Sequence, residues 1–136
     1  MIVADNSVLV AFWLPGACTE LAEAVKLRDS VWAAPILWRA EFRTVLASSL
    51  RKGLLTEAEA NTAYLNAQRD LGEREFTVPT ERVLRLALGS DCTAFECEYV
   101  ALAADLTAPL VTTNEKILRA FPKIAVSLAE FARKKE

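Results

Sequence analysis

The segment at residues 109–114, which reads PLVTTN, constrains the fold more than any other part of the chain. It is too short and too apolar to be anything but a buried strand, and it ends at the polar residue Asn114. The helix before it opens with a T-x-x-E pattern, in which Thr93 and Glu96 can each accept a bond from the other's backbone N–H. A capped helix, a short turn and a buried strand in succession favour a fold in which helices cover a parallel sheet.

The same alternation of short apolar strands and amphipathic helices runs through the whole sequence. Strands are predicted at residues 2–4, 31–34, 75–78, 109–113 and 124–126. Helices are predicted at residues 19–28, from Pro35 to about residue 52, at 56–71, at 80–88 and from residue 93 onward, with a short terminal helix capped by Ser127 and a fraying basic tail at 133–135. We therefore predict an α/β fold, a three-layer sandwich around a central, mainly parallel sheet, in one domain spanning residues 1–136.

The composition narrows the setting in which the chain works. Hydrophobic residues make up 53% of the 136 residues, yet no apolar run approaches the roughly 18 residues of a membrane span. The apolar surplus is expected at a subunit or partner interface. The first residues carry no secretion signal, which predicts a cytoplasmic location without membrane association. Cys18, Cys92 and Cys97 lack C-x-x-C spacing and are predicted to be small buried side chains in a reducing compartment.

Charge and histidine content limit the available chemistry. The formal net charge is −2, which does not favour nucleic-acid binding unless a bound cation reverses the sign of an acidic cluster. The sequence contains no histidine, so Ser-His-Asp and Cys-His catalysis and zinc ligation by imidazole are excluded. Any acid–base chemistry must therefore depend on other groups, the carboxylates first among them.

Two polar residues are predicted to meet at one edge of the sheet. Asp5 and Asn114 are each the first polar side chain after a predicted buried strand. In parallel α/β folds ligands bind outside the carboxyl ends of the strands, so both side chains are expected at that edge. Each also has a structural alternative, Asp5 as a cap of the following turn and Asn114 as the N-cap of a helix.

Two glutamates lie on apolar helix faces. On a helical wheel Glu96 groups with Val100, whereas Glu98 and Asp105 fall on the far side and are expected to point to water. Asp91 and Glu98 are near the site in sequence, which leaves a supporting role there as the alternative. Glu41 lies on the edge of the core-facing stripe of its own helix. The structural alternatives are that Glu96 serves only its capping box and that Glu41 extends its carboxylate out of the core edge.

The remaining residues are predicted to lie on solvated faces, to pack in the core or to contact phosphate. Other acids, Glu75 among them, are predicted on solvated faces, and Cys97 and Tyr99 are predicted to be packing residues. The basic residues on the far side of the helix that carries Glu41 are either phosphate contacts or a solvated face; they are Arg39, Arg43, Arg51 and Lys52.

Taken together, Asp5, Glu41, Glu96 and Asn114 predict a metal site. Carboxylates that folding brings close together repel one another unless a proton or a cation intervenes. Oxygen-only ligand sets suit Mg²⁺ or Mn²⁺.

These four residues lie in segments that resemble the motifs of PIN-domain ribonucleases, in particular the VapC-type toxins of VapBC toxin–antitoxin pairs. IVADNSVLVAFWLPG is similar to the family's first segment, in which metal-binding Asp5 is followed two residues later by Ser7. APILWRAEFRTVL resembles the second motif, whose glutamate corresponds to Glu41. CTAFECEYVALAADLTAPLVTTNEKIL resembles the third and fourth motifs together, and FPKIAVSLAEF fits the family's ending. The resemblance therefore covers nearly the whole chain.

The sequence departs from the family pattern at two positions. Glu96 and Asn114 stand where the family usually has Asp. Glutamate keeps the charge but moves the carboxylate outward by one methylene, while asparagine keeps one oxygen ligand, removes a charge and cannot act as a base. Both changes are expected to weaken metal affinity.

The resemblance implies a metal-dependent endoribonuclease that is the toxin of a toxin–antitoxin pair. Mg²⁺ or Mn²⁺ would be held by Asp5, Glu41, Glu96 and Asn114, with Ser7 hydrogen-bonded within the cluster. The implied partners are RNA, a cognate antitoxin and a second copy of the chain. The two departures support an alternative, a catalytically weakened PIN domain that binds RNA or antitoxin. A phospho-receiver is disfavoured because neither the strand at 31–34 nor the strand at 75–78 ends in Asp.

Overall fold

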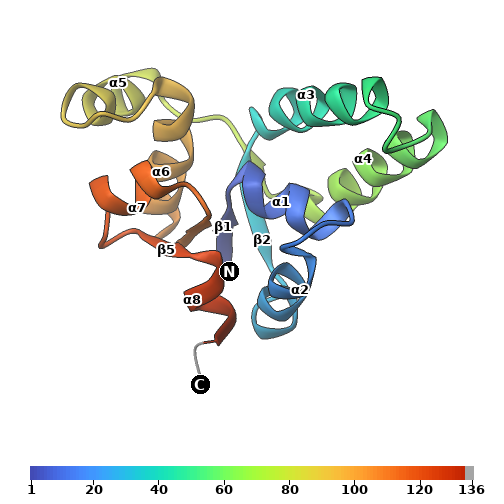
Figure 1. Cartoon of the computed structure of the whole chain (residues 1–136). Helices are drawn as coiled ribbons and strands as arrows, with labels where there is room; N and C mark the ends of the chain where they lie inside the picture. The colour runs from blue at the N-terminus through green and yellow to red at the C-terminus, as the bar shows by residue number, and fades with distance from the viewer. Residues whose placement is uncertain (134–136) are drawn as a thin grey trace.

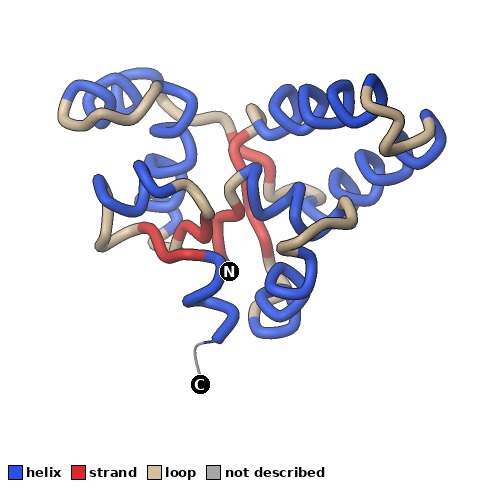
Figure 2. Tube along the Cα trace, viewed as in Figure 1, coloured by secondary structure: helices blue, strands red, loops and turns tan. Residues whose placement is uncertain are grey.

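The computed structural model describes residues 1–133, and its central feature is a five-stranded sheet. All neighbouring strands are parallel, in the order β3-β2-β1-β4-β5. The strands, red in Figure 2, lie in the middle of the molecule between the helices. The strands are β1 (Ile2–Ala4), β2 (Trp32–Pro35), β3 (Glu75–Phe76), β4 (Leu110–Thr112) and β5 (Ala125–Ser127). The predicted α/β class with a central parallel sheet is confirmed.

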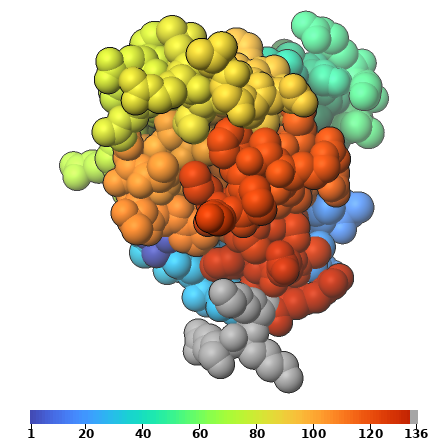
Figure 3. Space-filling model, turned by 90° about the vertical axis from the view of Figure 1, so that its left-hand side faces the viewer, coloured from blue at the N-terminus to red at the C-terminus, as the bar shows by residue number. Residues whose placement is uncertain are grey.

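Helices cover both faces of this sheet and complete the three-layer sandwich (Figure 1). One face carries the core formed with α1, α2, α3, α4 and α8, and the other carries the core formed with α5, α6 and α7. The helices are α1 (Asn6–Trp13), α2 (Thr19–Arg28), α3 (Trp38–Arg51), α4 (Glu57–Leu71), α5 (Thr80–Leu88), α6 (Ala94–Leu106), α7 (Glu115–Ala120) and α8 (Leu128–Arg133). Figure 3 shows the outer side of the layer formed by the later elements of the chain.

The central position of β1 in the sheet explains why residues 2–4 are all apolar. Ile2 and Ala4 face the core of the first helical layer, whereas Val3 faces the core of the second. Successive side chains of a strand point to opposite faces, so a strand covered on both sides buries every residue. Val3 pairs with Ala33 of β2 on one side and with Leu110 of β4 on the other, which places β1 in the middle of the sheet.

The predicted helix signals are confirmed where they are strongest. Capping boxes at Thr56 with Glu59 and at Thr93 with Glu96 open α4 and α6. Gly53 follows α3 with a φ of +71°, a left-handed conformation that a glycine adopts without a side-chain clash, and the helix ends there. Elements with local signals of this kind were predictable to within about one or two residues.

Some boundaries differ from the prediction. Pro35 ends β2 and does not open the next helix, because the Ile36 N–H donates to the Phe76 carbonyl at 2.8 Å and keeps this segment beside β3. The helix that carries Glu41 therefore begins at Trp38. The third strand stops at Phe76, two residues before its predicted end. The short helix α7 was not predicted as a separate element.

The chain ends also bear on the predictions. The Ser127 hydroxyl accepts a bond from the Glu130 N–H at 3.1 Å, so the predicted cap of the last helix is confirmed. The predicted basic tail lies outside the described residues after Arg133.

Cys18 is exposed, so its prediction as a buried side chain is wrong, whereas Cys92 and Cys97 are buried and free. Within residues 1–133, no helix has both the length and the apolar character needed to cross a membrane.

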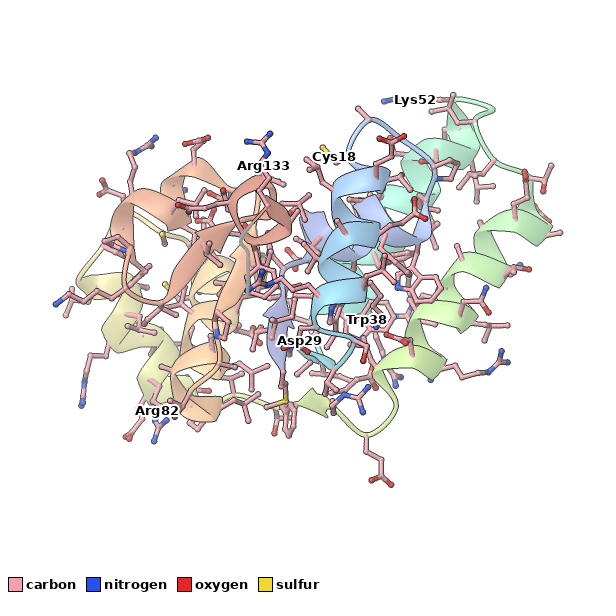
Figure 4. The ribbon with its side chains drawn as sticks, turned by 90° about the horizontal axis from the view of Figure 1, so that it is seen from below. Cys18, Asp29, Trp38, Lys52, Arg82 and Arg133 are labelled. Carbon is pink, nitrogen blue, oxygen red and sulfur yellow. The ribbon has the colours of Figure 1, made fainter. Side chains whose placement is uncertain are left out.

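The helices spread to opposite sides of the sheet. Figure 4 shows Arg82 of α5 at one end of the molecule and Lys52, directly after α3, at the other. Between them, α6 and α3 flank the end of β1, where α1 begins (Figure 1). The carboxyl ends of the central strands open into this region.

Candidate active site

A pocket of about 550 Å³ lies at the carboxyl ends of β1 and β4. From β1 the sheet continues to β2 on one side and to β4 on the other, and such a switch in strand order leaves a crevice between the outgoing connections. The predicted site residues all line this pocket, although they come from four separate segments of the chain: Asp5, Ser7, Glu41, Glu96 and Asn114. We refer to it as the acidic pocket.

Asp5 is held in place at the floor of the acidic pocket. Its side chain is 9% exposed, and its Oδ2 accepts hydrogen bonds from the Ser7 and Thr112 hydroxyls, each at 2.8 Å. The Ser7 Oγ in turn accepts a bond from the Thr113 N–H at 3.2 Å. The Asp5 side chain makes no capping bond to α1, so the alternative of a simple helix cap is wrong. These bonds join the ends of β1 and β4 through one carboxylate.

Glu41 receives its hydrogen bond from a buried tyrosine. The Tyr99 hydroxyl donates to the Glu41 Oε1 at 2.6 Å, and Tyr99 is 1% exposed. Burial raises the pKa of Glu41, and the nearby charges of Asp5, Glu98 and Glu96 raise it further, whereas the bond from Tyr99 opposes the shift. Burial also raises the pKa of Tyr99 far above its usual value, so its hydroxyl stays protonated and able to donate. The prediction that Tyr99 only packs is therefore wrong.

Glu96 makes several hydrogen bonds within the protein. Its Oε1 accepts from the Thr93 N–H at 2.7 Å and lies 3.1 Å from the Lys116 ammonium, while its Oε2 accepts from the Asn114 amide at 2.6 Å. Burial opposes ionisation of Glu96, but the bonds from Thr93, Asn114 and Lys116 outweigh it and lower the pKa. Glu96 therefore serves its capping box and faces the acidic pocket at the same time.

Asn114 also combines two roles. Its Oδ1 accepts bonds from the backbone N–H groups of Lys116 and Ile117, at 2.9 and 3.1 Å, and so caps α7. Its Nδ2 donates to Glu96. The structural alternative of an N-cap is thus confirmed, and the amide oxygen that could meet a cation is engaged by the helix.

Glu98 and Asp105 were both expected to point to water. Asp105 does so and pairs with Arg82 of α5. Glu98 is instead partly buried, burial raises its pKa, and its charge acts on Glu41. Glu98 was wrongly placed on a water-facing side because the helical wheel assumed one buried face, whereas the buried residues of α6, among them Cys97, Tyr99 and Leu102, lie all around the helix.

The acidic pocket has two electrostatically different halves. Asp5 and Glu41 have no ion-pair partner among residues 1–133, whereas Glu96 pairs with Lys116. Within the same residues, no group of three His, Cys, Asp or Glu side chains is arranged to hold a metal ion. Carboxylate oxygens of the Asp5 half fit Mg²⁺ in type, since this ion is usually bound by one or two carboxylates together with waters and phosphates.

Three functional neighbours were missed at the sequence level. Tyr99 was assigned to packing, and Thr112 and Lys116 were given no role. Thr112 is buried in β4, where its hydroxyl donates to Asp5 and accepts from the Asn114 N–H at 2.9 Å. A polar side chain inside an otherwise apolar strand is the signal that could have identified Thr112. Lys116 has no comparable signal, because its partner Glu96 is distant in the sequence.

The fold and the pocket define an α/β protein with a carboxylate-lined site at the switch point of a parallel sheet. No family model and no curated protein matches the sequence. The crystal structure of PAE2754 from Pyrobaculum aerophilum is similar, with a TM-score of 0.72 and 23% identity over 98% of this chain and 97% of that chain. FitAcB from Neisseria gonorrhoeae has a TM-score of 0.67 and 17% identity over 94% of this chain and 98% of that chain. At these identities the likeness concerns the fold, which is PIN-like.

Proposed function

We propose that this chain is a metal-dependent endoribonuclease and the toxin of a toxin–antitoxin pair. The observation that carries the proposal is that Asp5, Glu41 and Glu96, from β1–α1, α3 and α6, line one pocket at the carboxyl edge of the sheet. The pKa of Glu41 responds to the charges of both Asp5 and Glu96, so the three carboxylates lie within electrostatic reach of one another. Such repulsion is relieved when a cation binds between the acids.

In this proposal the protein supplies position and charge. Asp5 and Glu41 would hold Mg²⁺ or Mn²⁺, with Glu96 reached through water and Asn114 orienting that water. Ser7 and Thr112 fix Asp5 through bonds to one carboxylate oxygen, and Tyr99 fixes Glu41 in the same way. A bound ion of this kind polarises a phosphate oxygen and lowers the pKa of a bound water. Because the chain has no histidine, a carboxylate is the available general base.

The proposed partners follow from the motif resemblance and the surface. RNA is the proposed substrate, and a cognate antitoxin and a second copy of the chain are the proposed protein partners. Exposed leucines occur on both helical layers, among them Leu27 and Leu88, each 90% exposed. Light scattering coupled to gel filtration tests the homodimer, and a monomer over the micromolar range would contradict it.

Cleavage of structured RNA, with Mg²⁺ or Mn²⁺ titrated, tests the nuclease. Asp5→Asn is expected to abolish cleavage, because it removes a charged ligand at the floor of the acidic pocket. Asn114→Asp is expected to preserve or raise activity, because it restores the missing carboxylate. Glu57→Gln, an exposed acid at the start of α4, is the matched control and is expected to cleave like the wild type. Equal cleavage by wild type and Asp5→Asn would overturn the proposal.

A second function is favoured by one observation. Glu96 is already satisfied by Thr93, Asn114 and Lys116, as expected for a PIN-like domain that binds RNA or an antitoxin with little cleavage. Purified protein that binds RNA or its antitoxin, but cleaves no RNA at any concentration of either metal, would support this binding module over the nuclease.

A further inference from the structure

A second, more apolar pocket adjoins the acidic pocket. It has a volume of about 430 Å³, within the roughly 300–1,000 Å³ of small-molecule sites. Its walls are Asn6, Phe95 and five residues from the first half of α3 and the position just before it, namely Leu37, Ala40, Glu41, Thr44 and Val45. We call it the Phe95 pocket.

The two pockets are continuous. Asn6, Glu41, Val45 and Phe95 line both of them. A chain molecule with a charged backbone at the acidic pocket would therefore place its neighbouring groups at the Phe95 pocket. The chemical contrast is clear, since one pocket gathers carboxylates and the other is mostly hydrocarbon.

Phe95 is unusually exposed to solvent for an aromatic residue that lines a pocket. It is 61% exposed, although it lies in the first turn of α6 beside the capping box. Exposed aromatic rings are the platforms on which proteins stack unpaired bases, because every base has an apolar π-face. An apolar wall opposite such a ring, here on α3, suits the second face of a flat heterocycle.

Asn6 lines both pockets and carries an unsatisfied side-chain oxygen. Its side-chain Oδ1 is buried and has no hydrogen-bond partner within residues 1–133. A buried acceptor without a partner is destabilising. Because this oxygen has almost no exposed surface, a ligand N–H reaches it only when the Asn6 side chain turns toward the pocket, and the bond formed there removes the penalty. All four RNA bases carry an N–H donor suited to this acceptor.

We propose that the Phe95 pocket binds one unpaired nucleobase of an RNA whose backbone passes the acidic pocket. The base stacks on Phe95 against the apolar side chains of α3, and Asn6 accepts a bond from its edge. This inference rests on the proposed function for the choice of RNA. It also identifies Phe95 and Asn6 as substrate-positioning residues and an unpaired nucleotide as the part of the RNA that is recognised.

Binding of two oligomers separates base contacts from backbone contacts. The probes are a fluorescein-labelled 12-nucleotide oligoadenylate and an abasic oligomer of equal length and charge. Fluorescence anisotropy is measured in Ca²⁺, with gels to verify that the probe stays intact. Phe95→Ala is expected to weaken oligoadenylate binding at least about fivefold, the low end for one base–aromatic stack, and to leave abasic binding unchanged.

Matched variants keep the test decisive. Phe95→Trp keeps a stacking ring and is expected to retain wild-type affinity, whereas Asn6→Ala is expected to weaken only the base-containing probe. Leu84→Ala removes a side chain of similar exposure, 57%, on α5 and is expected to change neither affinity. Thermal unfolding checks that each variant is folded.

Unchanged oligoadenylate binding by Phe95→Ala would overturn the inference, and so would equal weakening for both probes. Loss of antitoxin binding by Phe95→Ala with RNA binding intact would assign the pocket to a protein and also overturn it. Failure of the nuclease proposal gives a different result, in which wild type cleaves no RNA yet still prefers oligoadenylate to the abasic probe.

Discussion

At the scale of single residues, the acidic pocket depends on neutral partners that fix charged ones. Ser7 and Thr112 hold Asp5, and Tyr99 holds Glu41, each through a hydroxyl that donates to a carboxylate. Hydrogen bonds of this kind favour the ionised acid without cancelling its charge. The hydroxyls therefore fix the carboxylates of the Asp5 half in position without the counter-charge that Lys116 supplies to Glu96.

Lys116 has the opposite effect on Glu96. Its ammonium lies 3.1 Å from the Glu96 Oε1 and neutralises part of the acidic pocket. The Lys116 ammonium therefore repels a divalent ion that binds near Glu96. Lys116 is 39% exposed, so solvent screens this effect and its size is modest.

Lys116→Gln is therefore expected to raise the affinity of the chain for Mn²⁺, by about two- to fivefold on the scale of one partly screened charge. Isothermal titration calorimetry with Mn²⁺ measures the change directly. Lys123→Gln, which removes an exposed lysine beyond α7, is the control and is expected to bind Mn²⁺ like the wild type. Weaker Mn²⁺ binding by Lys116→Gln would contradict a competing role for this lysine.

At the scale of elements, α3 is anchored to the sheet next to the residue that it contributes. The Arg39 guanidinium bonds both oxygens of Glu75 in β3, at 3.0 and 2.6 Å, and the Trp38 indole N–H donates to the same carboxylate. Glu75 was predicted on a solvated face, which is wrong, and Arg39 pairs with it instead of forming a solvated face. This network fixes the first turn of α3, which carries Glu41 and positions it at the acidic pocket.

The pH dependence of stability is expected to reveal this anchor. Burial opposes ionisation of Glu75, but Arg39 and Trp38 outweigh it and lower the pKa of the folded state. A lowered pKa contributes stability above the unfolded value of about 4.3, and the contribution is lost as pH falls through the folded pKa. Glu75→Gln is expected to be less stable than the wild type by about 2 kcal/mol at pH 7.

The difference between wild type and Glu75→Gln is therefore expected to shrink from pH 5 to pH 3. Urea unfolding at pH 7, 5, 4 and 3 measures it. Glu73→Gln, at an exposed neighbouring position, is expected to follow the wild type at every pH. Parallel curves for wild type and Glu75→Gln over this whole range would show that the network does not stabilise α3.

At the scale of the whole molecule, the sheet assembles a site that no local segment contains. Asp5 follows β1, Asn114 follows β4, and α3 and α6 bring Glu41 and Glu96 from either side. An ion bound between these elements would link parts of the chain that separate on unfolding. Ligands that bind only the folded state stabilise it in proportion to the logarithm of their concentration.

Mn²⁺ is accordingly expected to raise the melting temperature. At a free-ion concentration 100 times the dissociation constant the gain is about 2.7 kcal/mol, and each kcal/mol shifts the midpoint by about 4 °C for a domain of this size. Scanning fluorimetry with and without EDTA measures the shift. Asp5→Asn and Glu41→Gln are expected to lose most of it, and Glu57→Gln is expected to keep it. An undiminished shift in Asp5→Asn would place the ion elsewhere.

The sequence alone determined the fold class, most element positions and five polar residues of the acidic pocket: Asp5, Ser7, Glu41, Glu96 and Asn114. Short apolar strands, capping boxes at Thr56 and Thr93 and the stop at Gly53 are local signals, since each depends on side chains within one turn of the backbone. Asp5 and Asn114 could be placed at the carboxyl edge because parallel strands must point the same way. Exposure of Cys18 could not be predicted, because it depends on what packs over the α1–α2 loop.

Only the tertiary structure decided which partner each polar group meets. The Tyr99–Glu41 and Lys116–Glu96 contacts and the bond from Thr112 to Asp5 join residues far apart in the sequence. Hydrogen bonds and ion pairs act over a few ångströms, so their partners are fixed only once the sheet order and helix packing bring the segments together. The sequence thus identified the acids, and the fold determined which of them is neutralised and which remains available to a cation.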